Sequence, residues 1–428
     1  MEYLKNLIRK VTVKNLRNVN EGYIYYLVGE GLSKGIVFLF LGFFTNALSK
    51  EDFGKISLFW VSVPLLSVFI DFSQRSYIKY FYIHNTEKVR ELIVAIKMLC
   101  LILSPLYVVI FFIKDYYEIY IIDSKSDYLI LFSACLFAII ELYLSYFQIK
   151  GSYKKYNLVF IVRNAIPYIL AAIVIQYFSG NVYSFMIIQG CLMLLIVILF
   201  SKNDTLVRIG FKNGIQYLKS SIKFSLPFIP AMISVLALSF SDRFIINYYY
   251  SEIEVANYTV AYTVSSIFMA FFMATNKMWQ KFILENLKAK NIDKISRVTK
   301  YYILVVLSVA ILVVISREFL VSLMSNASYF LILDIVPTIV IGMFFYFLYT
   351  VLSNIPFFYK NTSLMVLPAI VAASVNLILN FILIPIYGYK VAAITTTCSY
   401  FIEFVIIYII CLQYYKVDVL FKTTNEFK

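Results

Sequence analysis

Residues 23–48 read YIYYLVGEGLSKGIVFLFLGFFTNAL, an apolar run long enough to cross a lipid bilayer as one α-helix. Within it, Glu30 and Lys34 place two ionisable side chains where a single charge costs at least ~2.5 kcal/mol. Lys34 lies about 16 Å along the helix from Tyr23, near the bilayer midplane. We therefore expect this helix to face a hydrated interior rather than lipid. Gly29 and its neighbours Gly31 and Gly35 weaken the helix and are expected to allow close backbone approach.

Runs of similar length recur along all 428 residues. The chain is 61% hydrophobic and only 14% charged, whereas about a quarter of the residues in a soluble domain are charged. The runs lack the alternation that marks a transmembrane β-barrel. We predict an all-α, polytopic membrane protein with twelve transmembrane helices, near 23–47, 56–78, 92–113, 128–148, 157–178, 181–201, 222–248, 256–279, 301–324, 329–358, 363–385 and 390–415.

The basic residues between the runs predict the orientation. Most Lys and Arg lie in alternate connecting segments, the asymmetry of the positive-inside rule, which places both termini in the cytoplasm. The net charge of +14 is then a topology signal, with membrane lipids as neighbours and no need for nucleic acid. The first segment and the stretch 281–300 show helical spacing of apolar residues among lysines, which predicts amphipathic helices on the inner leaflet.

The segment 201–221 divides the runs six and six, so the two halves are expected to be parallel repeats. SKEDFGKIS (49–57) and SEIEVANYT (251–259) match in residue type and support this. Such repeats enclose a substrate site between them, so we predict two six-helix bundles around a central cavity. The predicted parts are an interfacial segment (1–22), an N-terminal bundle (23–201), a cytoplasmic linker (202–221), a C-terminal bundle (222–415) and a cytoplasmic tail (416–428).

Ionisable residues within the runs supply the candidate site. They are Glu30, Lys34, Asp71, Arg75, Lys97, Glu141, Arg163, Asp242, Arg243, Lys277, Asp334 and Glu403. The pair Asp71 and Arg75 is expected to form one helical turn near the cytoplasmic end and, like Lys277, to reach water.

Four of these cations form a candidate lining for an anionic or diphosphate group: Lys34, Lys97, Arg163 and Arg243. Arg163 has no acidic residue nearby in the sequence, so it needs either a distant acidic partner or an anionic ligand. The acids Glu30, Glu141, Asp242, Asp334 and Glu403 are either fixed partners of the cations or coupling groups that bind H⁺ or Na⁺. The sequence does not choose between these roles.

Catalytic and metal motifs are not expected. The five cysteines lie in apolar runs without a CxxC pair, the single histidine, His84, lies in a polar loop, and no GxxxxGK[ST] motif occurs. We therefore predict no catalytic residue, no metal site, no cofactor other than a coupling ion, and no enzymatic activity.

The stretch SLPFIPAMISVLALSFSDRFIINYYYSEIEVANYTVAY (225–262) resembles the seventh-helix region of bacterial polysaccharide and O-antigen flippases. The shared features are an opening Leu-Pro, an Asp-Arg pair at 242–243, an acidic turn and a Tyr-x-x-Ala. LSKEDFGKIS (48–57) resembles the first outward turn of these proteins. NLILNFILIPIYGYKVAAITT (376–397) resembles their connection between the last two helices. These flippases belong to the multidrug/oligosaccharidyl-lipid/polysaccharide exporter superfamily.

The resemblance implies a function. It implies ion-coupled, alternating-access translocation of an undecaprenyl-diphosphate-linked oligosaccharide, an O-antigen or capsule unit, from the cytoplasmic to the outer leaflet of the bacterial inner membrane. Polysaccharide polymerase and chain-length proteins would be partners in polysaccharide and lipopolysaccharide biosynthesis. Lys34 and Arg243 fall in regions where the family carries basic lumen residues; Lys97 and Arg163 rest on the residue pattern alone.

Two alternatives remain open. A cation-coupled multidrug exporter of the same superfamily would favour acidic rather than basic residues in its lumen. A membrane-embedded polysaccharide polymerase or glycosyltransferase would need catalytic groups on a substantial outward loop. The most acidic outward segment, KDYYEIYIIDSKSDY (114–128), is short and reads as a solvated turn.

Overall fold

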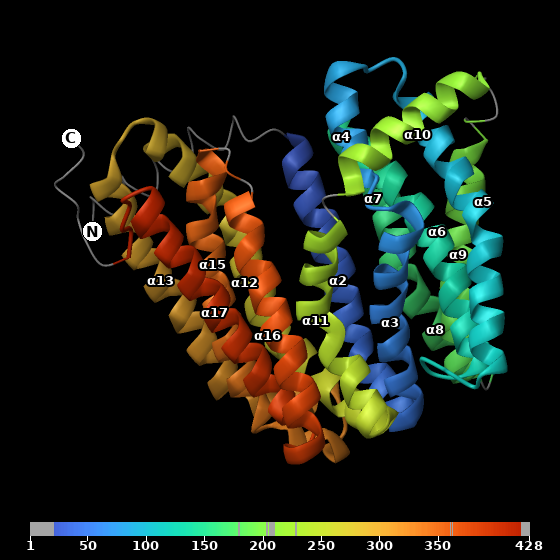
Figure 1. Ribbon diagram of the computed structural model, residues 1–428. Coiled ribbons are helices and arrows are strands. Elements are labelled where there is room, and N and C mark those ends of the chain that lie inside the picture. The colour runs from blue at the N-terminus through green and yellow to red at the C-terminus, as the bar shows by residue number, and fades with distance from the viewer. Residues whose placement is uncertain are drawn as a thin grey trace. The chain divides into compact units, whose positions relative to one another are not determined.

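The computed structural model describes residues 21–178, 180–202, 204, 210–226, 229–359, 361 and 363–420 (Figure 1). These residues form helices joined by short turns, and no strand occurs among them. The predicted all-α class is confirmed. Most of the predicted interfacial segment 1–22 and the end of the predicted tail lie outside the described residues.

The chain divides into two compact units. Unit 1 comprises Met1–Phe40 and Ser62–Leu226, and unit 2 comprises Leu41–Val61 and Pro227–Lys428. Residues 41–61, which join the first two predicted runs, therefore belong with the C-terminal half of the chain. Unit 1 is therefore not a continuous stretch of the chain, because residues 41–61 interrupt it.

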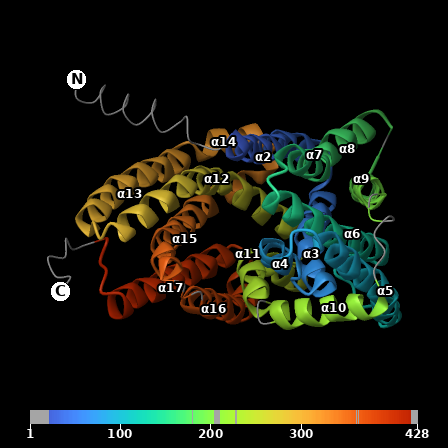
Figure 2. The ribbon, with the colours of Figure 1, turned by 90° about the horizontal axis from the view of Figure 1, so that it is seen from above.

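Unit 1 is built around helix α6. Its elements are the first part of α2 (Glu21–Ala47), the second part of α3 (Lys50–Asp71), α4 (Arg75–His84), α5 (Val89–Tyr116), α6 (Ser124–Ile149), α7 (Tyr153–Asn164), α8 (Ile166–Tyr177), α9 (Val182–Ser201) and α10 (Phe211–Ser225). α6 packs against α4, α5, α7 and α9, and Figure 2 shows α5 and α9 beside it. Buried alanines such as Ala134 and Ala138 let the neighbouring helices approach.

Unit 2 has α15 at its centre. Besides the remaining parts of α2 and α3, it contains α11 (Ile229–Tyr249), α12 (Glu252–Lys288), α13 (Ile292–Ile315), α14 (Arg317–Met324), the 3₁₀-helix η3 (Ala327–Ile332), α15 (Ile335–Phe358), α16 (Ser363–Tyr387) and α17 (Val391–Tyr414). α15 packs against α12 and α17, and α16 against α11 and α17. Gly342 allows α15 and α17 to approach closely, because a Cβ there would lie 2.7 Å from Thr397 Oγ1. That hydroxyl instead donates to Thr338 O over 2.8 Å.

Ten helices in the described part of the chain are long and apolar enough to cross a membrane, counting 153–177 as one. α2, with a shorter apolar part at Gly31–Ala47, and α11, which carries Asp242 and Arg243, fall at the two remaining predicted positions. The chain is a multi-pass membrane protein.

The second predicted spanning helix, near 56–78, is present as α3, but its C-terminal end differs from the prediction. α3 ends at Asp71 and α4 begins at Arg75. Between them, Phe72 and Ser73 have φ values of 47° and 55°, in the left-handed region that residues other than glycine rarely adopt. Asp71 is fully buried rather than reaching water.

The separate interfacial helix predicted at 281–300 is also wrong. α12 continues to Lys288 and α13 starts at Ile292, so this stretch is the junction of two long helices. The amphipathic spacing fits both arrangements, because the end of a spanning helix also meets the membrane surface.

The predicted linker contains a helix, α10, that docks within unit 1. Ser221 donates to Gln74 Oε1 over 2.5 Å, and Tyr217 donates to Glu91 Oε2 over 2.9 Å. Phe224 stacks on Tyr80 with ring centroids 5.0 Å apart. The seventh spanning helix consequently starts at Ile229 rather than at the predicted residue 222.

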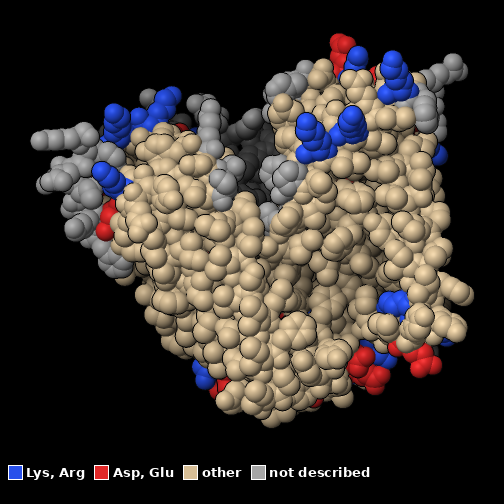
Figure 3. Space-filling model, viewed as in Figure 1, with Lys and Arg blue, Asp and Glu red and all other residues tan. Residues whose placement is uncertain are grey.

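Charged side chains are concentrated at the ends of each unit in the view of Figure 3. On unit 1, Lys and Arg gather at the end that carries α4 and α10, and the middle of the visible surface is almost free of charge. This is the distribution expected for a unit embedded in a bilayer.

Candidate functional site

Helix α2 carries the first predicted charged pair, Glu30 and Lys34, whose side chains lie outside the described part of the structure. Close approach at the neighbouring glycines is confirmed at Gly29, where a Cβ would lie 2.4 Å from a side chain of α7. It is wrong at Gly31 and Gly35, where no described atom lies within 4 Å of such a Cβ.

Lys97, predicted as an anion contact, has an acidic partner. Its Nζ lies 2.7 Å from Oδ2 of Asp204, just after α9, and 3.3 Å from Ser201 Oγ. Tyr143 of α6 donates to the same carboxylate. Lys97 and Asp204 are both buried, so their charges cancel inside unit 1. The two residues are 107 positions apart, beyond what local spacing reveals.

Arg163 also has an acidic partner, Glu141. Arg163 Nη1 lies 2.6 Å from Glu141 Oε1, and Arg75 Nη1 lies 3.6 Å from Glu141 Oε2. The Arg163 guanidinium lies over Phe137, 4.4 Å from the ring centroid, a favourable cation–π contact. Of the two possibilities that the sequence offers for Arg163, a distant acid or an anionic ligand, the structure shows the acid. α7 brings Arg163 to it by packing on α6.

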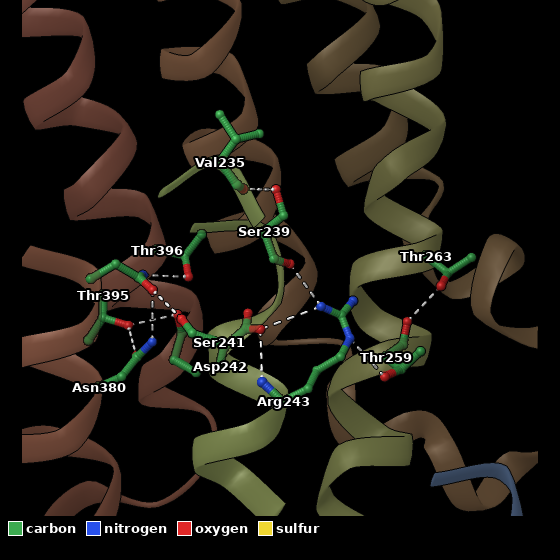
Figure 4. Close-up of polar contacts among 12 residues, drawn as sticks. Val235, Ser239, Ser241, Asp242, Arg243, Thr259, Thr263, Asn380, Thr395 and Thr396 are labelled. Atoms are coloured by element: carbon green, nitrogen blue, oxygen red, sulfur yellow. Dashed lines mark hydrogen bonds and ion pairs between the residues drawn. The ribbon is translucent and has the colours of Figure 1, made fainter. Parts of the chain in front are cut away.

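Arg243 of α11 has a longer ion pair than Lys97 or Arg163 (Figure 4). Its Nη1 lies 3.4 Å from Asp242 Oδ1 and donates to Ser239 O over 3.1 Å, and its Nε donates to Thr259 Oγ1 over 3.3 Å. The guanidinium lies over Tyr262, 4.7 Å from the ring centroid. Its Nη2 makes no hydrogen bond to the described residues. The side chain is buried, yet it retains a free donor.

A polar cluster borders Asp242 in Figure 4. Its members are Ser241 of α11, Asn376 and Asn380 of α16, and Thr395 and Thr396 of α17. Ser241 donates to Asn376 Oδ1 over 3.0 Å, and Asn376 donates to Thr396 Oγ1 over 3.2 Å. All are buried. Oδ2 of Asp242 has no hydrogen-bond partner among the described residues.

This cluster offers carboxylate, amide and hydroxyl oxygens, the ligand types that hard cations prefer. Groups of three or more His, Cys, Asp or Glu that could hold a metal do not occur among the described residues. Of the residues in and beside this cluster, the sequence predicts only Asp242 as a site residue. The available signal for the rest was the pair Asn376 and Asn380, two amides one helical turn apart inside an apolar run.

Glu403 of α17 is 2% exposed. Neither a hydrogen bond nor an ion pair joins it to any side chain that the structure describes, and its Oε2 is buried without a partner. Glu141, by contrast, forms ion pairs with two arginines, Arg163 and Arg75.

Asp334 does not lie inside a spanning helix, which corrects its predicted position. It precedes α15, its side chain is 62% exposed, and its Oδ2 lies 2.7 Å from Nζ of Lys390. The apolar run that suggested a longer helix begins with the 3₁₀-helix η3 instead.

The segment 114–128, predicted to face outward, contains a turn stabilised by its own carboxylates. Asp123 caps α6 by accepting from the backbone N–H of Ser126 over 2.9 Å. Asp127 accepts from the N–H of Ile121 over 2.9 Å and pairs with Lys114. These acids are engaged in structure, and Asp127 is buried rather than solvated as predicted.

Two family models match the sequence. The model described as "Polysaccharide biosynthesis protein" matches residues 19–277, more than half of the chain. The MatE model matches residues 227–382.

Two curated relatives come from Haemophilus influenzae. "Lsg locus putative protein 1" is 24% identical over 279 residues, covering 63% of this chain and 67% of the relative. An "Uncharacterized membrane protein" is 21% identical over 272 residues, covering 61% of this chain and 64% of the relative, just under two thirds of its length.

Solved structures share the fold. The lipid II flippase MurJ, in an inward closed conformation, has a TM-score of 0.70 at 15% identity, covering 92% of this chain and 87% of its own. An inward-facing multidrug resistance MATE family transporter of the MOP superfamily has a TM-score of 0.64 at 13% identity, covering 89% and 92%. At these identities the likeness concerns the fold.

Proposed function

The chain belongs to the polysaccharide biosynthesis protein family, and from this premise we propose that it is a flippase. Its substrate is an undecaprenyl-diphosphate-linked oligosaccharide, an O-antigen or capsule repeat unit, carried from the cytoplasmic to the outer leaflet by alternating access. The MurJ structure supports the choice of a lipid-linked substrate, because that protein is itself described as a lipid II flippase and has this fold.

The observation that carries the proposal is the state of Arg243. Lys97 and Arg163 lie 2.7 Å and 2.6 Å from carboxylates that are distant in the sequence, whereas Arg243 lies 3.4 Å from the carboxylate of its sequence neighbour Asp242. A buried guanidinium with a long ion pair is suited to a phosphate oxygen, because charge-assisted hydrogen bonds are strong where water is excluded.

The candidate cations therefore divide into two roles. Arg243, with Lys34 as the corresponding residue of the N-terminal half, is proposed to contact the diphosphate. Lys97 and Arg163 are proposed to stabilise unit 1 through Asp204 and Glu141. Glu30 is proposed to balance Lys34.

Ion coupling belongs to the proposal as well. The oxygen cluster around Asp242, Asn376 and Asn380 is proposed to take a hard monovalent cation such as Na⁺, and Glu403 is the candidate for H⁺. We place the protein in the bacterial inner membrane with both termini cytoplasmic. Polymerase and chain-length proteins of polysaccharide synthesis are its proposed partners.

A multidrug exporter is the second candidate, because the MatE model matches residues 227–382. An exporter of cationic drugs would tolerate loss of Arg243, since a cation gains nothing from a guanidinium. The two candidates therefore differ in how they respond to one substitution.

The test is outer-leaflet exposure of a fluorescent undecaprenyl-diphosphate oligosaccharide in proteoliposomes. Arg243→Gln should slow flipping roughly tenfold or more, because a hydrogen bond to a charged group contributes about 1.5–3 kcal/mol. The double variant Asp242→Asn/Arg243→Gln keeps the site neutral and guards against misfolding. Lys281→Gln removes a cation whose side chain is 72% exposed on α12 and should flip at the wild-type rate.

Wild-type flipping with unchanged rates in both Arg243 variants would remove Arg243 from the mechanism. Transport of a cationic dye by all variants, without flipping of any of several glycans, would favour the exporter.

A further inference from the structure

An apolar groove lies between α13 and α15 on the surface of unit 2. It encloses about 200 Å³. Its lining side chains extend from Leu307 to Ile315 on α13 and from Val340 to Phe344 on α15, and every one of them is apolar. A cavity of this composition holds no ordered water and accepts hydrocarbon.

The groove opens to the outside of unit 2. Ile311, Ile315 and Ile341 line it and are 50%, 72% and 51% exposed. Of the ten long apolar helices in the described part of the chain, α13 is the least buried, at 22% of its most apolar stretch. Figure 2 shows α13 at the edge of unit 2, with α12 and α15 packed on its inner side. In a membrane, an exposed groove of this kind is filled by lipid.

The groove has the depth of one leaflet. Leu307 and Ile315 are eight positions apart, which corresponds to about 12 Å along a helix. One leaflet contributes about 15 Å to the hydrocarbon core. α13 ends at Ile315 and α14 begins at Arg317, so this end of the groove lies where the chain leaves the spanning helix. In the proposed topology this is the level of the outer headgroups.

Arg317 lies at this end of the groove. Its Nη1 donates over 3.0 Å to the carbonyl oxygen of Val314, a residue that lines the groove. Its Nε is buried and has no hydrogen-bond partner among the described residues. Within the same residues no ion pair joins it to a carboxylate, including that of its exposed neighbour Glu318. A guanidinium with an unused, buried donor is suited to a phosphate oxygen.

The two features together select an amphiphile. The groove alone would accept any hydrocarbon chain, and Arg317 alone would accept any small anion. Placed one leaflet's depth apart, they match an acyl chain and the phosphate to which it is joined in one lipid. A polyprenyl chain is much longer than a leaflet is deep, so most of it would lie outside the groove.

We propose that the groove between α13 and α15 binds one glycerophospholipid, with an acyl chain along Ile311 and Ile341 and the phosphodiester on Arg317. Binding is non-covalent, and no bond is made or broken. The bound chain adds apolar contacts to α13, the least buried spanning helix, and so stabilises its packing on α15. The site does not depend on which substrate the protein transports.

Native mass spectrometry of the delipidated full chain in detergent tests the site. The probes are dioleoyl phosphatidylglycerol and dioleoylglycerol, which has the same chains without the phosphate. Wild type should bind one phosphatidylglycerol roughly tenfold or more tightly than dioleoylglycerol, because a hydrogen bond to a charged group contributes that factor. Arg317→Gln should bind the two equally. Dioleoyl phosphatidylethanolamine should bind to wild type as phosphatidylglycerol does, because the phosphate is the shared contact.

Two matched pairs of variants locate the binding. Ile311→Trp fills the groove and should weaken binding of both lipids, whereas Leu312→Trp, at a 63% exposed neighbour outside the lining, should bind as wild type does. Arg297→Gln removes an exposed arginine at the opposite end of α13 and should leave the preference for phosphate intact. If Arg317→Gln does not fold, Arg317→Lys should still reduce that preference, because an ammonium lacks the guanidinium fork.

Four outcomes would overturn the proposal. Equal binding of both probes to wild type would remove the phosphate contact, and unchanged binding to Ile311→Trp would remove the groove. Tighter binding of undecaprenyl phosphate than of phosphatidylglycerol, lost in Ile311→Trp, would assign the groove to a polyprenyl chain. A dimer of the delipidated chain that Ile311→Trp abolishes would assign it to a second copy. None of these measurements involves transport, so a failed flipping assay would leave the lipid site standing.

Discussion

The two units treat buried charge differently. In unit 1, the cations Lys97 and Arg163 meet carboxylates from other helices at 2.7 Å and 2.6 Å. In unit 2, Arg243 and Asp242 are adjacent in sequence and 3.4 Å apart, and Glu403 has no counter-charge among the described residues. Short pairs between helices hold a fold together, whereas loosely paired groups keep capacity for a ligand or a proton. We infer from this difference that the ion pairs of Lys97 and Arg163 in unit 1 are structural, whereas Arg243 and Glu403 in unit 2 are candidates for function.

The strongest test of this difference is the same substitution, glutamate to glutamine, made once in each unit. Glu141→Gln leaves Arg163 and Arg75 without their shared carboxylate and should destabilise the protein by roughly 1–3 kcal/mol, because the arginine donors lose their partner in a site that is only partly exposed. Glu403→Gln replaces a carboxyl group without a counter-charge among the described residues by an amide of the same shape and should change stability by less than about 1 kcal/mol. Unfolding in mixed detergent, followed by circular dichroism, measures both.

Equal losses in the two variants would mean that Glu403 has an ionic role after all, and the contrast between the units would fail. Glu285→Gln is the control for the substitution at an exposed position, where no change is expected.

A second prediction concerns residues 41–61, the N-terminal segment that belongs to unit 2. A Cβ on Gly54 of α3 would lie 1.9 Å from Glu252 O on α12. Gly54→Ala should therefore destabilise the protein by about 1–3 kcal/mol, as overpacking does. Gly35→Ala, where no described atom lies within 4 Å, should be neutral or stabilising by up to about 1 kcal/mol through helix propensity. Thermal unfolding of the two variants in the same detergent measures this difference. If Gly54→Ala did not lower the unfolding temperature, the close packing of residues 41–61 within unit 2 would be contradicted.

The smallest expected effect is at α10, which lies outside the spanning helices. Burial and the hydrogen bond to Glu91 raise the pKa of Tyr217 to about 12, so the phenol stays a donor at neutral pH. Tyr217→Phe should loosen α10 by about 1 kcal/mol or less, seen as faster amide hydrogen exchange over 211–225. The difference should persist through neutral pH and vanish as the pH rises from 10 towards 12, where the wild-type phenol also loses its proton. Unchanged exchange would show that the aromatic contacts of Phe224 suffice.

Much of the architecture could be predicted from local pattern. Apolar run length placed the spanning helices, because a helix in lipid must be apolar along its whole length. The errors cluster where the backbone leaves the regular helix. The left-handed residues Phe72 and Ser73 follow no glycine or proline signal, and the amphipathic spacing of 281–300 fits a helical junction as well as a surface helix.

The ionisable residues of the candidate site could be identified from the sequence, but their ion-pair partners could not. Asp242 and Arg243 were recognisable as neighbours, yet the partner of Lys97 lies 107 positions away. The polar cluster around Asn376 was overlooked because single amides and hydroxyls cost little in a helix and carry no charge signal.

The sequence by itself determined that this protein is a bundle of membrane helices with ionisable residues inside it, because those features depend only on composition and spacing. Only the tertiary structure decided which charges cancel and which remain available. Tertiary packing brings Asp204 to Lys97 and Glu141 to Arg163, and it buries Glu403 without a partner for Oε2 among the described residues. The reason is physical: the energy of a buried charge depends on its neighbours in space, and those neighbours are distant in the chain.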